Sequence, residues 1–164
     1  MRLMRKMRVW LNASLIGAVV IGGCGGDFVE TTTNQYSNYK EAVTDGALQR
    51  GWLPRNIPDS AHEITEAHNV DTNEVLAKFK FDRVDMNNLL RQCAKTTDLQ
   101  LPSAARAKKI AAWWPEMLTD KSSVQLPNTM QAYRCSKMPH AENEFDATMI
   151  LDMQGQTAWY WIEP

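Results

Sequence analysis

The sequence predicts an α+β domain with a small antiparallel sheet of three to five strands, a C-terminal hairpin, and short helices packed on one face of the sheet. The hairpin rests on residues 145–152 and 158–162, where apolar and polar side chains alternate on either side of Gln154-Gly155. Residues 75–81 alternate in the same way and predict a further strand, half-buried, with its lysines facing water. The chain contains no βαβ repeat, glycine fingerprint or internal repeat.

Two helices are expected in the first half of the chain. Apolar residues recur with helical spacing after Ser37, which can cap the first helix. Ser60-Ala61-His62-Glu63 has the pattern of a capping box, in which the serine hydroxyl and the glutamate satisfy the first free N–H groups. This pattern predicts a short second helix over residues 61–67. The polar residues 71–73 then predict a turn.

The second half of the chain contains the two cysteines of the predicted domain, Cys93 and Cys135. Residues 86–93 have one apolar helical face, which places Cys93 on the core side of a helix. Residues 104–114 predict another helix, and residues 130–135 predict a strand that brings Cys135 toward Cys93. An exported chain enters an oxidising space, so we expect a disulfide between them. The alternative is two buried free thiols; a zinc site needs more ligands at closer spacing.

The N-terminal residues have the layout of an export signal. Residues 2–8 contain four basic side chains and no acid, and an apolar run of 14 residues follows over 10–23. The run ends in Ile21-Gly22-Gly23-Cys24, which resembles the lipobox of a bacterial lipoprotein. The resemblance implies that Cys24 is acylated and that the chain is cut before it. The alternatives are a transmembrane helix, for which the run is shorter than the required ~20 residues, and a signal peptide whose cysteine carries no lipid.

This interpretation divides the chain into a signal peptide over 1–23, a lipidated flexible tether over 24–36 and a single globular domain over 37–164. The resemblance also implies an outer-membrane location facing the periplasm, because Gly25 stands where retained lipoproteins have aspartate. The formal charge of the chain is −1, and removing the four basic residues before Cys24 leaves −5. The sequence therefore has no basic footprint for nucleic acid, and attachment to the membrane depends on the lipid.

A block in the first half of the predicted domain resembles small bacterial lipoproteins with a YbbD-like head domain. In that group a Gly-Trp-Leu-Pro block precedes a proline-serine-alanine segment, an Asp-Thr-Asn turn and an aromatic-rich strand. The corresponding residues here are Arg50-Gly51-Trp52-Leu53-Pro54, Ile57-Pro58, Ser60-Ala61, Ile64, Asp71-Thr72-Asn73, Phe79 and Phe81. The resemblance covers about residues 39–81, and it implies no activity and assigns no catalytic residue.

Catalytic chemistry has few candidates in this sequence. His62 and Glu66 are four apart on the predicted second helix, with Glu63 and His68 close in sequence, and such a cluster can bind zinc or transfer protons. However, the two histidines are six residues apart, and neither an H-E-x-x-H nor a G-x-S-x-G motif occurs. We therefore expect no enzyme, no metal and no cofactor.

Three tryptophans, Trp52, Trp113 and Trp114, are candidates for a binding surface, with burial in the core as the alternative for each. The leading functional hypothesis is a lipid-anchored binding or interaction module whose partner is an envelope component or an unknown protein. One alternative is an immunity-type inhibitor that neutralises a toxin in the periplasm. The other is a hydrolase or metal-dependent enzyme.

Overall fold

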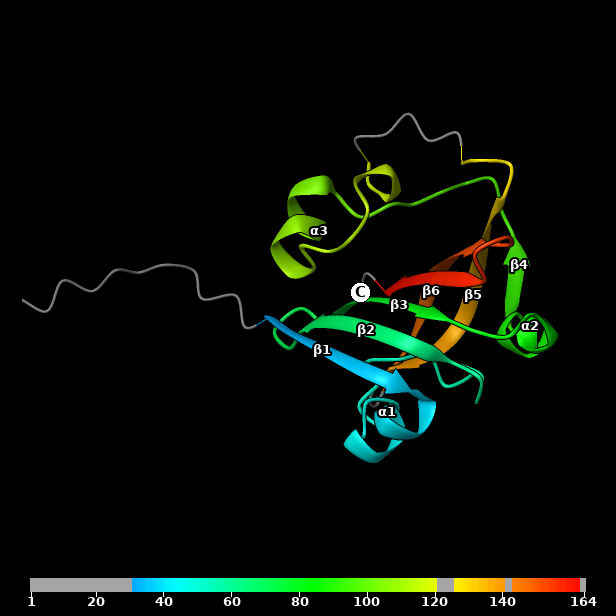
Figure 1. Cartoon of the computed structure of the whole chain (residues 1–164). Helices are drawn as coiled ribbons and strands as arrows, with labels where there is room; N and C mark the ends of the chain where they lie inside the picture. Colours follow the sequence, from blue (N-terminus) through cyan, green and yellow to red (C-terminus); the bar gives the residue numbers. More distant parts are fainter. Residues whose placement is uncertain (1–30, 121–125, 141–142, 163–164) are drawn as a thin grey trace, which may run out of the picture.

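The computed structural model describes residues 31–120, 126–140 and 143–162, of which 137–140 and 143–145 are described by their backbone alone (Figure 1). The predicted signal peptide, the lipid site at Cys24 and the tether up to residue 30 lie outside the described residues. Within the described ranges, no helix is long and apolar enough to cross a membrane.

One antiparallel sheet of seven strands organises the described residues, with the spatial order β1-β2-β3-β7-β6-β5-β4. The predicted sheet of three to five strands is therefore wrong. The predicted hairpin is present, as β6 and β7 pair around Gln154-Gly155. In chain order the strands are β1 (Thr31–Asn38), β2 (His62–Asn69), β3 (Glu74–Lys80), β4 (Cys93–Lys95), β5 (Met130–His140), β6 (Asn143–Asp152) and β7 (Thr157–Ile162).

Strand β1 replaces the second half of the expected tether. Its residues are polar and only Tyr36 is buried, so the segment lacks the apolar alternation that marks a strand in sequence. Its pairing with β2 runs without interruption from Thr31↔Asn69 to Tyr36↔Ile64. The folded part consequently starts at least six residues before the expected boundary at residue 37.

Strand β2 replaces the predicted helix over 61–67. The capping-box residues have other partners: Ser60 Oγ donates to Asp85 Oδ2 at 2.6 Å, and Lys80 Nζ donates to Glu63 Oε1 at 2.8 Å. Pairing with β1 on one side and β3 on the other satisfies the backbone of the strand. Tertiary pairing thus overrides the local helix signal.

The helices are short. The first, α1 (Tyr39–Asp45), begins after Asn38, whose side chain accepts the backbone N–H of Glu41, and it ends at Gly46 in the left-handed conformation with φ 85°. The predicted helix over 86–93 is reduced to η1 (Arg83–Asp85) and α2 (Met86–Leu89). Cys93 is therefore the first residue of β4 and not part of a helix. The remaining helices are α3 (Ala104–Ile110), capped by Ser103, and η2 (Glu116–Leu118).

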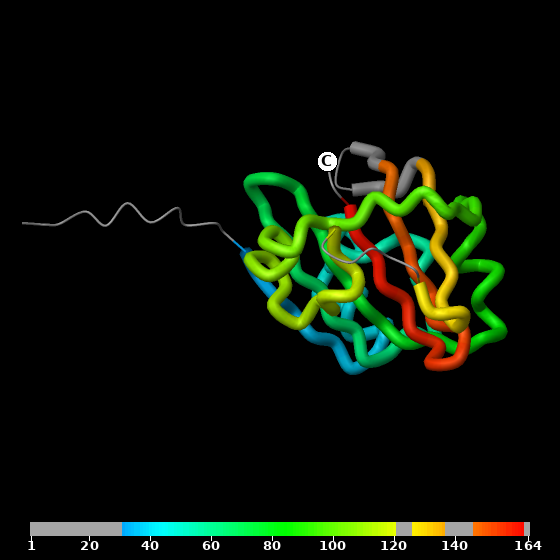
Figure 2. Tube along the Cα trace, turned by 90° about the horizontal axis from the view of Figure 1, so that it is seen from above, coloured from blue at the N-terminus to red at the C-terminus, as the bar shows by residue number. Residues whose placement is uncertain are grey.

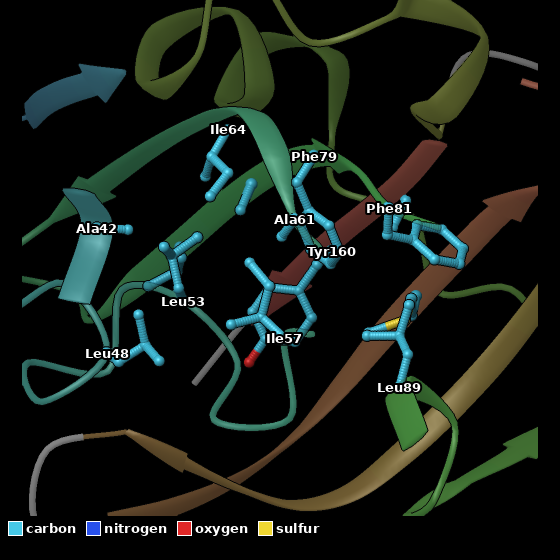
Figure 3. Packing of buried hydrophobic residues seen from close by; sticks show 14 of the residues in the cluster. Ala42, Leu48, Leu53, Ile57, Ala61, Ile64, Phe79, Phe81, Leu89 and Tyr160 are labelled. Carbon is cyan, nitrogen blue, oxygen red and sulfur yellow. The ribbon is translucent and has the colours of Figure 1, made fainter. Parts of the chain in front are cut away.

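The sheet is covered on both faces, which contradicts the expectation of helices on one face (Figure 1). A first hydrophobic cluster lies under α1, α2 and the loop that follows α1; Figure 3 shows Leu53, Ile57, Phe79 and Tyr160 at its centre. A second cluster lies under α3, and Trp161 belongs to it. In Figure 2 the chain returns from β4 across the sheet to α3.

Coverage of both faces explains the burial of the central strands. Strand β3, predicted as half-buried, lies between β2 and β7 and places Val75 in the first cluster and Leu76 in the second. Both side chains are at most 2% exposed. A strand buried on both faces carries apolar residues in succession, and alternation alone does not reveal it.

Candidate interaction site

The edge of the sheet at β1, a strand that pairs with β2 alone among the described residues and is called the free edge below, is the first part of the candidate site. The backbone N–H of Ser37 donates to Glu41 Oε2 at 2.7 Å, so it points away from β2. Because the backbone groups of an antiparallel strand point alternately to either side, those of Thr33 and Gln35 also point outward. Both residues are exposed. The edge therefore presents N–H and C=O groups to which another strand can bind.

An open hollow of about 830 Å³ lies beside this edge, between β1 and α1. Its lining residues all have side chains with polar groups, and both Lys40 and Glu41 are exposed on the α1 side. The hollow is positioned by the direct step from strand to helix at Asn38, which ends β1 and caps α1. The lining residues are Asn34, Gln35, Tyr36, Asn38, Lys40, Glu41, Thr44 and Asp45.

A buried hydrogen-bonded group lies behind the edge on the same face of the sheet. Glu66 is fully buried in β2; its Oε1 accepts from Asn34 Nδ2 at 2.6 Å, and its Oε2 lies 2.9 Å from His68 Nδ1. His68 is 2% exposed. A buried carboxylate is costly unless it is hydrogen-bonded, and here both oxygens have partners. The contact to Asn34 ties β1 to β2 by side chains as well as by the backbone ladder.

A second chain of contacts ties α1 and its following loop to β2. The ring of Trp52 stacks on His68 with centroids 3.6 Å apart, and the guanidinium carbon of Arg50 lies 3.9 Å from the centroid of Trp52. Arg50 also donates to the carboxylate of Asp45 at 2.6 Å, and Tyr36 donates its hydroxyl to the same carboxylate at 2.8 Å. These contacts hold the helix that forms one wall of the hollow against the strand that forms the other.

The pKa values of Asp45 and Tyr36 are shifted by their hydrogen bonds, nearby charges and burial. The hydrogen bond from Tyr36 holds the pKa of Asp45 below its ordinary value, and the hydrogen bond and charge of Arg50 act in the same direction. The pKa of Tyr36 is raised mainly by burial, with contributions from its hydrogen bond to Asp45 and from the charge of Glu66. At neutral pH the tyrosine is therefore the donor and the aspartate the charged acceptor.

A pH-dependent contribution to stability follows for Asp45. Because its pKa is lowered in the folded state, its contribution is present above the ordinary pKa of the carboxyl and is lost as the pH falls through the lowered value. We expect Asp45→Asn to lower the urea midpoint near neutral pH and to match the wild type in strong acid. Urea unfolding across the acid range tests this, with the exposed Asp59→Asn as control. A constant difference between wild type and Asp45→Asn at every pH would contradict it.

The histidine and glutamate candidates from the sequence do not gather at one place. Glu66 and His68 meet, because residues two apart on a strand share a face. His62 is the first residue of β2, six positions and about 20 Å along the strand from His68, with its Nδ1 3.0 Å from the backbone oxygen of Ser60. Glu63 pairs with Lys80. Across the described ranges, no three His, Cys, Asp or Glu residues are arranged to hold a metal ion.

The three candidate tryptophans do not form one surface. Trp52 is half-buried on the first cluster, whereas Trp113 and Trp114 pack on the second, across the sheet. Trp114 is 7% exposed and donates its indole N–H to the backbone oxygen of Leu118 at 2.8 Å, so it is a core residue. Trp113 remains partly accessible at the rim of that cluster.

The two cysteines paired in the sequence analysis are bonded in the structure. Cys93 and Cys135 are directly opposite residues of β4 and β5, with an S–S distance of 2.01 Å. The bond lies at the opposite edge of the sheet from β1. It secures a strand of only three residues.

A comparison with known protein families finds a match for the part of the chain that contains the hollow. Residues 30–80 match the family model of the YbbD head domain. The match confirms the resemblance found in the sequence, and it spans β1, α1, β2 and β3. The segment that resembles the YbbD head domain therefore contains the free edge, the hollow and the buried Glu66–His68 pair. No curated protein and no solved structure matches the chain.

Sequence reasoning missed the other residues of this site, namely Asn34, Tyr36, Asp45 and Arg50. Asn34 and Tyr36 fell within the expected tether. The spacing of these residues offered a signal. Asn34 and Tyr36 are two apart, so they share one face if the segment is a strand, and Glu66 and His68 share the matching face of the neighbouring strand. The helix expected over 61–67 concealed it.

Proposed function

We propose that the protein is a lipid-anchored envelope protein whose YbbD-like part binds an extended segment of a partner protein by strand addition along β1. The observation that carries the proposal is the outward-pointing backbone of Thr33 and Gln35 at the free edge. In strand addition, main-chain hydrogen bonds provide affinity, and neighbouring pockets that take alternate side chains provide specificity.

The composition of β1 supports this role. Natural edge strands are commonly protected against pairing by lysine, proline or a bulge. Strand β1 has none of these over Thr31–Asn38, and its register with β2 is regular up to Tyr36. The adjoining hollow is lined by polar groups, so we expect polar side chains on the inner face of the added strand. Glu66 and His68 take a structural role in this proposal, since both are buried and Trp52 stacks on the ring of His68.

The proposed anchor would keep the edge near the membrane. Seven positions separate Cys24 from Thr31, and such a segment extends at most about 25 Å. A partner reached by β1 would then be another envelope component. This arrangement fits the lipobox-like residues Ile21–Cys24 and requires no charge attraction between protein and lipid.

Strand addition is tested by removing one outward N–H. A photoreactive residue in place of Gln35 should crosslink one envelope protein in cells. Thr33→Pro should abolish that crosslink, because proline has no N–H to donate, while it leaves the fold intact at an outward edge position. Thr33→Ser, which keeps the N–H, should leave the crosslink unchanged. An equal crosslink in Thr33→Pro and Thr33→Ser would refute strand addition at β1.

The anchor is tested separately. Cys24→Ser should move the protein from the membrane fraction to the soluble envelope fraction, because the thiol is the proposed site of acylation. Fractionation followed by immunoblotting measures the change, and Ser14→Ala, a small change in the same apolar run that keeps Cys24, serves as the control. Retention of Cys24→Ser in the membrane fraction would rule out the lipid anchor.

A further inference from the structure

A second surface feature lies on the opposite face of the sheet from the hollow. It is a groove of about 220 Å³ between the end of β3, the start of β7 and the segment that joins α3 to η2. Two tryptophans and two lysines line it together with small and polar residues. The lining residues are Glu63, Lys78, Phe79, Lys80, Trp113, Pro115, Thr157 and Trp159.

The strand register builds the floor of this groove. Lys78 lies directly opposite Trp159, and Lys80 lies directly opposite Thr157. Alternation places these four side chains on the face of the second hydrophobic cluster, next to its member Trp161. Trp113 stands on the facing wall, where the ammonium of Lys78 lies 5.4 Å from the centroid of its ring.

The groove has an excess of positive charge. Lys80 pairs with Glu63, whereas Lys78 has no ion pair with a carboxylate among the described residues. The hydrogen bond from Lys80 lowers the pKa of Glu63, and the charges of Lys80, His62 and Lys78 act in the same direction. The groove therefore attracts an anionic group in a chain whose formal charge is −1.

Hydrogen-bonding groups accompany the aromatic rings. The indole N–H of Trp113 is buried and has no acceptor among the described residues, so it is not counted among the groups that face the groove. The hydroxyl of Thr157 donates to the backbone oxygen of Gly155 at 3.1 Å, so its oxygen can still accept. Glu63 supplies carboxylate oxygens at the rim. The groove thus offers aromatic ring faces, the ammonium group of Lys78, and acceptor oxygens on Thr157 and Glu63 close together.

We propose that this groove binds a sugar acid, a sugar ring that carries a carboxylate. The apolar C–H face of the ring would lie on Trp113 or Trp159, the carboxylate would pair with Lys78, and ring hydroxyls would bond to Glu63 and Thr157. A flat aromatic acid would satisfy the tryptophans and Lys78 but would have no hydroxyl groups for the remaining acceptor positions of Glu63 and Thr157. A neutral sugar would leave Lys78 without its counter-charge. This site is independent of the proposed role of β1.

Calorimetric titration of the full chain in detergent tests the proposal with D-glucuronate, D-glucose and benzoate as probes. We expect glucuronate to bind at least about tenfold more tightly than glucose or benzoate. Lys78→Met, which keeps the aliphatic stem but removes the charge, should reduce the affinity for glucuronate to that for glucose. Lys95→Met, the same change at an exposed lysine of β4 that belongs to neither proposed site, should have no effect.

The location of binding is read from the tryptophan indole N–H signals in NMR spectra. Glucuronate should shift the signals of Trp113 and Trp159 and leave that of Trp52, on the other face, unchanged. The proposal is overturned by equal affinity for glucose, by benzoate binding as tightly as glucuronate, by absence of binding, or by an unchanged affinity in Lys78→Met.

Discussion

Replacing Glu66 with alanine should lower the free energy of unfolding by about 2–6 kcal/mol, because two polar groups lose their hydrogen-bond partner at about 1–3 kcal/mol each. The carboxylate is fully buried and is the hydrogen-bond partner of both Asn34 Nδ2 and His68 Nδ1. Alanine would leave these two polar groups without this partner, and Trp52, which stacks on His68, covers the histidine. Urea unfolding followed by tryptophan fluorescence measures the change.

Two further variants distinguish the loss of the Glu66–His68 hydrogen bond from the loss of side-chain volume. Glu66→Gln keeps an acceptor for Asn34 and should lose much less stability than Glu66→Ala. In a double-mutant cycle, Glu66→Ala combined with His68→Ala should cost clearly less than the sum of the two single changes, since each single change strands its partner. Additive effects, or a loss below about 1 kcal/mol for Glu66→Ala, would show that the pair does not stabilise this half of the sheet.

The Glu66–His68 pair shows which features of the fold can be predicted from the sequence and which cannot. On a helix, Glu66 and His68 would point about 200° apart; on β2 they share a face and meet. Whether this segment forms a helix or a strand depends on whether β1 and β3 are available as neighbours, which is a property of the whole sheet. Strand β1 could not be identified because an edge strand of polar residues has the composition of a linker.

Features whose causes are local were predicted correctly. The hairpin of β6 and β7 has strong alternation and a turn at Gln154-Gly155, so it needs no distant partner to be recognised. The helix after Ser37 has both an apolar face and a glycine at its end, although Asn38 provides the cap. The number of strands and the covering of both faces depend on long-range pairing, and neither was predicted.

Removing the Cys93–Cys135 bond should lower the free energy of unfolding by about 4 kcal/mol, because the crosslink closes a loop of 42 positions and restricts the unfolded chain. Loss of the bond should also destabilise the folded state locally, at β4. Strand β4 has only three residues, and the bond attaches it to β5 at the edge of the sheet. We therefore expect the double variant Cys93→Ala/Cys135→Ala to fold less stably and to expose β4 to amide hydrogen exchange before the central strands β3 and β7.

Reduction provides the matched control, since it removes the bond without changing the sequence. Wild-type protein in reducing buffer should unfold at the same urea concentration as the double variant, and the oxidised wild type should unfold at a higher one. Alkylation before reduction should modify neither cysteine, because a disulfide leaves no thiol to react. If reduction leaves the unfolding curve unchanged, or if both thiols are alkylated in the purified native protein, the bond does not contribute to stability. If amide exchange in the reduced protein is confined to β4, the bond stabilises the pairing of β4 with β5 at this edge of the sheet. Glu66 would then have the corresponding role at the other edge, where it is hydrogen-bonded to Asn34 of β1.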